Sequence, residues 1–97
     1  MVLASSPIIA ERVFEMVKDS RRGELRLRLW APSYTGERNF ACPVQISGIH
    51  NDRVFEIVGE DSLQALQLAI KFAGSLLQGQ VEQGAQISWF NTNNLGL

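Results

Sequence analysis

Apolar and polar residues alternate along the first half of the chain, and this period of two restricts the fold more than any other feature. The alternation is clear in VFEMV (13–17), ELRLRLW (24–30) and FACPVQIS (40–47). Successive side chains of a strand point to opposite faces, so each segment is typical of a strand with one buried face. With RVFEIV (53–58), four strands are expected before residue 59.

The first two segments are expected to form a hairpin. A loop of four residues, 19–22, gives each face of this hairpin a single character. In that register Glu15 meets Arg26, and Val13 lies near Arg28 on the charged face. The apolar face consists of Phe14, Met16, Leu25, Leu27 and Leu29. A shift of one residue would mix the two faces, which favours this loop length.

A different period begins after the fourth strand. Ser62 to Gln78 form an apolar helix, and Gly79 is expected to close it. AQISWF (85–90) is a fifth strand. The sequence therefore predicts an α+β fold, in which one helix packs on one face of an antiparallel sheet of four to five strands. The expected order is strand, strand, strand, strand, helix, strand. Pro43 cannot donate a ladder hydrogen bond, so it is expected at an edge, a bulge or the beginning of its strand.

A chain of 97 residues builds one core, so we expect a single domain over 1–97 with flexible ends near 1–7 and 91–97. The net charge of -1 provides no field to attract nucleic acid or an acidic membrane. No apolar run approaches the roughly 20 residues of a membrane span, and the first residues make a poor secretory signal. The single cysteine excludes an internal disulfide, and we expect a cytoplasmic protein.

Residues with catalytic or metal-binding chemistry are few. Cys42 and His50 are the only soft ligands, too few for a zinc site within one chain. Cys42 falls on the apolar face of its strand and His50 falls in a turn, and no third residue completes a triad. The glycines near residue 80 lack the Lys and the Ser or Thr of a phosphate-binding loop. We expect no catalytic residues, no metal site, no cofactor and no enzymatic activity.

The beginning of the helix, GEDSLQALQLAI (59–70), resembles the site at which acyl carrier proteins receive phosphopantetheine on a serine. The resemblance implies attachment at Ser62. It covers only this segment, because carrier domains are helical bundles and this helix lies between strands. A helix cap explains the same residues. The Asp61 side chain can accept hydrogen bonds from the first-turn amides, while the Gln64 side chain reaches back to the backbone before the helix. The carrier is the less favoured alternative.

A second resemblance covers residues 12–90. The helix DSLQALQLAIKFAGSLL, followed by a short strand that bears tryptophan, is similar to a family of small uncharacterised bacterial single-domain proteins. Their shared pattern is strands, then Asp-Ser-Leu-Gln-Ala-Leu at the beginning of a helix, then a terminal strand that ends in Trp. The resemblance implies a bacterial protein without an assigned activity, and many such proteins act by binding another protein.

The helix carries more apolar surface than one contact with a sheet needs. The stripe expected to face the sheet consists of Leu63, Leu66, Ile70, Ala73 and Leu77. Leu68, Phe72 and Leu76 widen the apolar arc to about 220°. Either the curved sheet and the chain ends cover these three residues, or they form an exposed patch that marks an interface. The patch predicts self-association as a homodimer.

The hairpin carries most of the basic residues and is a second candidate surface. It consists of Arg21, Arg22, Arg26, Arg28 and Trp30. Basic side chains beside an aromatic ring can bind phosphates while a base stacks, so a nucleic-acid-binding domain is one alternative. Acidic residues interrupt the basic cluster, so a solvated hairpin face explains the pattern better than nucleic-acid binding does. The leading hypothesis is a non-enzymatic protein-binding domain, most concretely an inhibitor or an immunity-type protein with an unknown protein partner.

Overall fold

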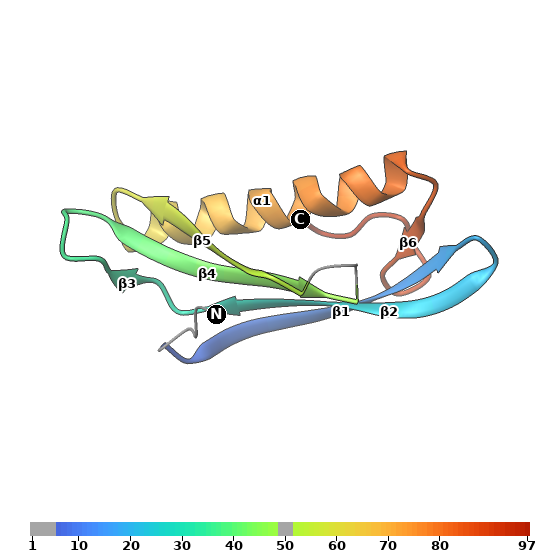
Figure 1. The fold of residues 1–97 in the computed structure, drawn as a ribbon, viewed down its shortest axis with the longest axis horizontal. Coiled ribbons are helices and arrows are strands. Elements are labelled where there is room, and N and C mark those ends of the chain that lie inside the picture. Colours follow the sequence, from blue (N-terminus) through green and yellow to red (C-terminus); the bar gives the residue numbers. More distant parts are fainter. Residues whose placement is uncertain (1–5, 49–51) are drawn as a thin grey trace.

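The computed structural model describes residues 6–48 and 52–97 and contains one sheet and one helix (Figure 1). The elements are β1 (Ile8–Lys18), β2 (Arg21–Trp30), β3 (Ser33–Tyr34), β4 (Phe40–Ser47), β5 (Val54–Gly59), α1 (Ser62–Glu82) and β6 (Gln86–Ser88). The strands pair antiparallel, and α1 lies along one face of the sheet. The expected α+β class is confirmed. The sheet has six strands because the two-residue β3 precedes β4.

β4 is the strand around which the sheet is organised. β5 pairs along one side of it, and β2 and β3 share the other side, so that β3 continues β2. β1 lies beyond β2, and β6 pairs with β1 only at Glu15–Val17. Among the described residues, β5 pairs with β4 alone and the outer edge of β1 before Glu15 has no partner strand. Two stretches of strand edge are therefore open.

Pro43 lies inside β4, opposite Glu56 of β5. On the other side of β4, pairing with β2 ends at Val44 and pairing with β3 begins at Ala41. In this gap the three residues Trp30–Pro32 face only two residues of β4. Pro43 thus lies within a central strand, and the irregularity in pairing falls opposite it, where β2 passes into β3.

The β1–β2 hairpin has the expected faces but a different register. Asp19 and Ser20 both have positive φ, 53° and 64°, and Lys18 pairs with Arg21. This is a two-residue turn of the type that suits a hairpin, so the predicted four-residue loop is wrong. The register moves by two residues, which keeps every side chain on its predicted face. The predicted pairing of Glu15 with Arg26 is wrong, because Glu15 lies opposite Glu24.

The core lies between α1 and one face of the sheet. Its sheet side contains the predicted apolar face of the hairpin, with Phe14 and Leu25 fully buried and Met16 packed at the margin. The helix side differs from the prediction, because the fully buried stripe of α1 is Ala65, Ala69, Ala73 and Leu77. Leu63, predicted to face the sheet, is 62% exposed. Small alanine side chains bring the helix close to the sheet, and the larger side chains pack along both flanks of the stripe.

The beginning of α1 has the predicted cap. Asp61 Oδ1 accepts from the Gln64 amide at 2.7 Å, and Gln64 Oε1 accepts from the Glu60 amide at 2.7 Å. The predicted end is wrong, because α1 runs through Gly79 to Glu82. Gly84, with φ of 100°, ends it. The amides of Gly84 and Ala85 donate to Val81 and Gln80, which satisfies the last carbonyls in a Schellman motif.

The C-terminal segment 91–97, expected to be loose, lies against the sheet and the helix. Arg12 Nη1 donates to the Leu95 carbonyl at 2.9 Å, and its guanidinium stacks on the Trp89 ring at 3.8 Å. Leu95 packs against the core. A tight turn at Phe90 and Asn91, both with positive φ, directs the chain away from β1 and back past Trp89.

Two glycines near the end of α1 should respond oppositely to the same substitution. Gly79→Ala adds a methyl group to a helical position with nothing within 4 Å and should raise the free energy of unfolding by about 1 kcal/mol. Gly84→Ala forces an L side chain into the left-handed region and should lower it by about 1 kcal/mol. Urea denaturation of both variants measures the difference. A loss of stability in Gly79→Ala alone would contradict this helix end.

Candidate functional site

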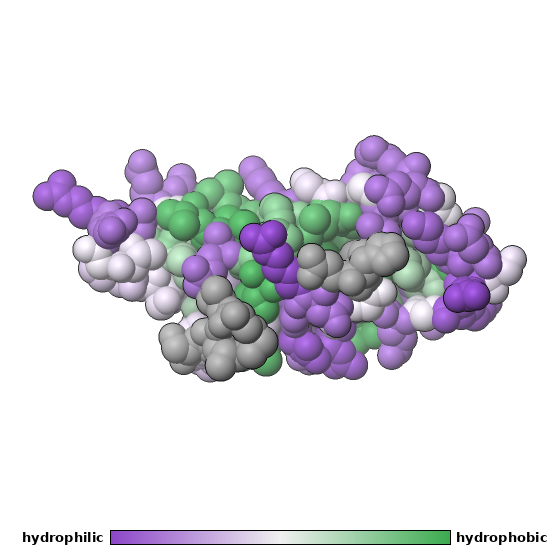
Figure 2. Space-filling model, in the orientation of Figure 1, coloured by the Kyte–Doolittle hydropathy of each residue, from purple (hydrophilic) through white to green (hydrophobic). Residues whose placement is uncertain are grey.

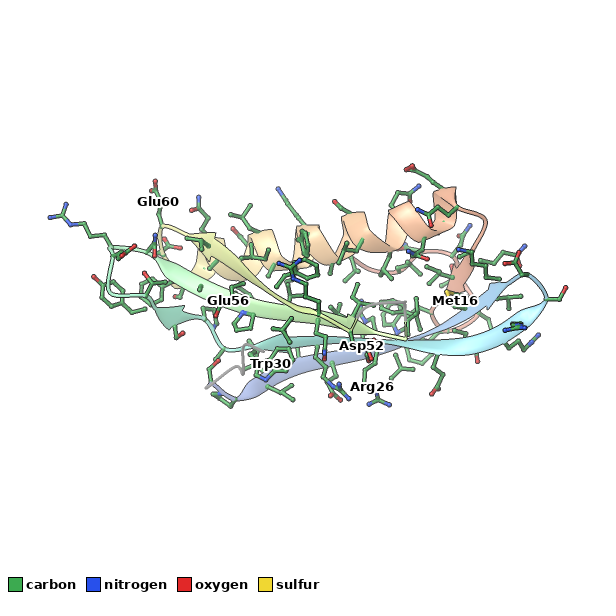
Figure 3. All side chains as sticks on the ribbon, viewed as in Figure 1. Met16, Arg26, Trp30, Asp52, Glu56 and Glu60 are labelled. Atoms are coloured by element: carbon green, nitrogen blue, oxygen red, sulfur yellow. The ribbon has the colours of Figure 1, made fainter. Side chains whose placement is uncertain are left out.

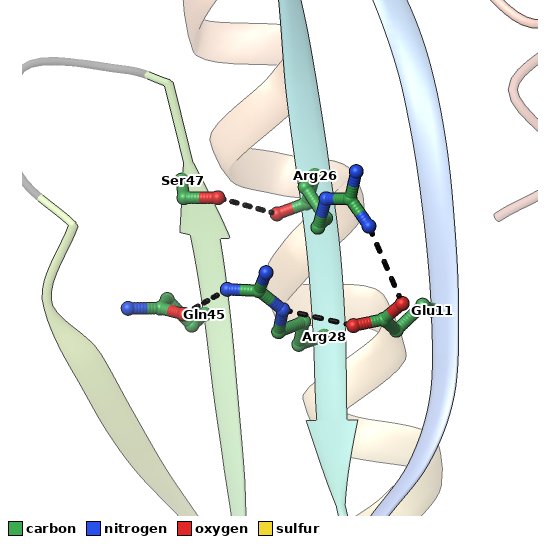
Figure 4. A network of polar contacts seen from close by, with 5 residues as sticks. All are labelled: Glu11, Arg26, Arg28, Gln45 and Ser47. Carbon is green, nitrogen blue, oxygen red and sulfur yellow. Dashed lines mark hydrogen bonds and ion pairs between the residues drawn. The ribbon is translucent and has the colours of Figure 1, made fainter.

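The face of the sheet opposite α1 carries a polar network (Figure 4). Arg28 Nε donates to Glu11 Oε1 at 2.9 Å, and Arg26 Nη1 donates to Glu11 Oε2 at 3.5 Å. Arg28 also reaches Gln45 Oε1 of β4 at 3.4 Å, and Ser47 donates to the Arg26 carbonyl. These groups are partly exposed, and exposed ion pairs contribute only about 0–1 kcal/mol. The network orders the open face of the sheet more than it stabilises the fold.

The five residues predicted as one partner surface do not lie together. Arg26, Arg28 and Trp30 alternate with the buried leucines of β2 and so occupy the open face. Figure 3 shows Arg26 and Trp30 pointing away from α1. Arg21 and Arg22 lie at the other end of β2, next to the hairpin turn. Ten residues of strand separate the two ends by about 30 Å. The prediction therefore divides into an open-face group and a pair at the hairpin tip.

The charges of the open face have both signs. Glu11 lies between Arg26 and Arg28, while Glu15 and Glu24 pair directly across the hairpin. Sequence reasoning missed Glu11 because it began the first strand at residue 13 and assumed the longer turn. A two-residue turn at Asp19–Ser20 would have aligned Glu11 with Arg28. A guanidinium bound to a carboxylate is less available to a phosphate, which weighs against nucleic acid.

A second surface lies where α1 borders the open edge of β5. We define the α1–β5 surface as Leu68, Phe72 and Leu76 of the helix with Phe55 of the strand. Leu68 is 38% exposed, whereas Val58 alternates with Phe55 and Ile57 along β5 and is exposed on the opposite face of the sheet. Phe72 and Leu76 are partly buried and pack against the core, and Phe72 contacts Phe55 edge to face with ring centroids 4.9 Å apart. Figure 2 shows hydrophobic residues gathered along α1 where β5 runs beside it.

The structure thus brings the three predicted self-association residues together on one flank of the helix. Phe72 and Leu76 are only partly exposed, because they also pack against the core. Leu68 provides the largest exposed fraction of the three. The missing signal in the sequence was the neighbouring strand, because the open β5 edge follows from tertiary pairing that a single sequence does not reveal.

Charged residues of opposite sign flank the β5 edge. Arg53 precedes the strand and lies over the Phe55 ring, 4.7 Å from its centroid. Glu60 and Asp61 follow the strand at the beginning of α1, as Figure 3 shows for Glu60. Arg53 and Glu60 are exposed. Asp52 lies beside Arg53, but its carboxylate accepts from the Gly48 amide at 3.1 Å and so belongs to the neighbouring turn.

Of the two predicted soft ligands, Cys42 is the one that the structure describes. Cys42 is fully buried and its Sγ donates to the Trp30 carbonyl at 3.3 Å. Burial raises the pKa of the Cys42 thiol above its ordinary value, so the thiolate is suppressed near neutral pH. His50, the other predicted soft ligand, lies outside the described residues. Within residues 6–48 and 52–97, no three His, Cys, Asp or Glu side chains gather as metal ligands.

Ser62, implied as a phosphopantetheine site by its local resemblance, is the first residue of α1 and is exposed. The strands before and after this helix make the surroundings unlike those of a carrier bundle. An open depression of about 1120 Å³ lies near the hairpin end, between the second half of α1 and the C-terminal segment. Its lining mixes polar and apolar side chains without a charged cluster of one sign.

Retention on a phosphate matrix tests the role of Glu11. The wild-type chain should bind weakly at about 0.1 M salt, because Arg26 and Arg28 are paired with its carboxylate. Glu11→Gln removes one negative charge and releases both guanidinium groups, so retention should increase. Glu37→Gln makes the same charge change away from the open face and serves as the control. Equal retention of the two variants would show that Glu11 does not restrain the arginines.

Alkylation of Cys42 by iodoacetamide should be slow in the folded chain and fast in concentrated urea. The expected cause is burial, which excludes the reagent and raises the thiol pKa. The rate should increase with pH as the thiolate forms. Fast alkylation without denaturant would show that the Cys42 thiol is accessible and able to act as a nucleophile, which would contradict its burial.

Among the described residues, no helix has both the length and the apolar character that a membrane span requires. No curated protein and no solved structure matches the chain. A family model for a domain of unknown function, DUF6968, matches residues 10–97, which include all of α1 and nearly the whole sheet. This single domain contains both surfaces described above. The chain therefore belongs to the DUF6968 family.

Proposed function

We propose that this chain is a non-enzymatic protein-binding domain that uses the α1–β5 surface. The observation that carries the proposal is the position of an apolar helix flank beside an open strand edge. An unpaired edge offers backbone donors and acceptors, and the flank offers apolar area, which together favour a protein that supplies a strand. Leu68 is the exposed apolar member, and Phe72 gives the surface a rigid base.

The absence of a catalytic arrangement in the described residues is consistent with this role but does not carry it. An inhibitor or immunity-type protein of a bacterial cytoplasm is its most concrete form, because such a protein needs a folded surface and no chemistry. The buried thiol supports a structural role for Cys42.

The open face provides a second binding surface in this proposal. Arg26 and Arg28 are held side by side by Glu11, and Trp30 lies further along the same strand face. Arginine and tryptophan are frequent in the centres of protein interfaces. Glu11 would lower the cost of binding by fixing the guanidinium positions before the partner arrives. Arg21 and Arg22 lie too far from Trp30 to join this surface.

Photo-crosslinking at single positions of α1 tests the proposal. A benzoylphenylalanine residue replaces Leu68 in one chain and Gln67 in a control chain, and both are expressed in the source cells. Both positions are exposed on the same helix turn, but Gln67 lies on the polar side. We expect a discrete protein adduct at position 68 and a much weaker one at position 67.

Mass spectrometry then identifies the adduct, which is either a second copy of this chain or another protein. Each of these results supports a protein-binding role. No adduct at position 68, in chains whose circular dichroism shows an intact fold, would overturn it. Equal adducts at both positions would also contradict a surface confined to the α1–β5 side.

A further inference from the structure

We propose that the α1–β5 surface binds a second copy of this chain, with the two β5 strands paired antiparallel about a two-fold axis. This inference rests on the proposed function and names the partner. The paired strands would join two sheets into one continuous sheet, with both helices on the same face. Three independent features of the described residues favour a second copy over an unrelated strand.

The first feature is the position of the helix over the sheet. α1 packs on β4 and β5 to a similar extent, so its axis lies over the space between these two strands. Neighbouring strands are about 4.8 Å apart. Pairing of β5 with its two-fold copy would therefore place the two helix axes about 10 Å apart, which agrees with the 8–10 Å at which helices pack. An isolated peptide strand would satisfy the β5 edge but would leave the helix flank uncovered.

The second feature is the apolar flank itself. A two-fold axis beside β5 brings the same flank of both helices together, so Leu68 of each copy would meet Leu68 and Phe72 of the other. Both side chains lie on the side of α1 that borders β5, as the Phe72–Phe55 contact establishes. Apolar contact with a copy would remove the exposed part of Leu68 from water.

The third feature is the distribution of charge along the β5 edge. The edge begins with Arg53 and ends with Glu60 and Asp61, so an antiparallel copy sets opposite charges together at both ends. The register centred on Ile57 places Arg53 across from Asp61. It also places each Glu56 across from Val58. A register centred on Glu56 would instead oppose two identical carboxylates on one face.

Sedimentation equilibrium of the full chain tests the pairing by charge exchange. The wild type is compared with Arg53→Glu, with Asp61→Arg and with the chain that carries both substitutions, at about 0.1 M salt. We expect a wild-type dimer. Each single substitution opposes like charges twice in the dimer and should weaken association by roughly tenfold or more. The double substitution should restore it, and a mixture of the two single variants should form a mixed dimer.

Glu37→Arg, an exposed charge reversal in the loop before β4, is the control and should leave association unchanged. The urea midpoint of each variant shows whether the fold is retained. A monomeric wild type, or a dimer that neither single substitution weakens, would overturn the second-copy proposal. If the wild type is monomeric while position 68 crosslinks to another protein, the protein-binding function stands and only the identity of the partner fails.

Discussion

The short connection between β5 and α1 is the constraint on which the rest of the structure depends. Gly59 lies directly under the first turn of the helix, and a Cβ atom there would collide with the backbone of Ala65. The helix therefore begins at the edge strand and must return along it. Because the buried stripe is mostly alanine, α1 lies close over β4 and β5. A single helix in this position cannot cover the whole sheet.

The remaining features follow from this off-centre helix. The half of the sheet formed by β1 and β2 needs another cover, and the C-terminal segment provides part of it through Leu95 and the Arg12–Trp89 stack. On the opposite side, the flank of α1 extends to the open edge of β5. The apolar residues outside the buried stripe of α1 therefore occupy two kinds of position. Phe72 and Leu76 complete the core margin, and Leu68 faces solvent.

The sequence was informative wherever side-chain alternation determines the outcome. The hairpin faces were predicted although the register was displaced by two residues, because an even displacement leaves each residue on its face. The Asp61 cap was predicted from local chemistry alone.

The end of the helix was not predicted, since Gly79 and Gly84 are equally permissive as residue types and only the backbone distinguishes them. The rotation of α1 was missed because alanine gives a weak hydrophobic signal although it occupies the closest contact. The candidate surfaces depended most on tertiary pairing, so Leu68 could be named from sequence while the open β5 edge beside it could not.

The short β6 strand has a consequence for assembly. It pairs with three residues of β1 and then turns away at Phe90, so residues 6–48 and 52–97 leave a second open edge on β1 as well as that of β5. Copies joined by β5 to β1 would always leave one edge of each kind free and would grow into a fibre. Copies joined by β5 to β5 use up that edge in both copies, so growth through β5 stops at two. In the proposed dimer, the opposite charges at the two ends of β5 would thus favour this finite pairing over a fibre, which bears on solubility as well as on recognition.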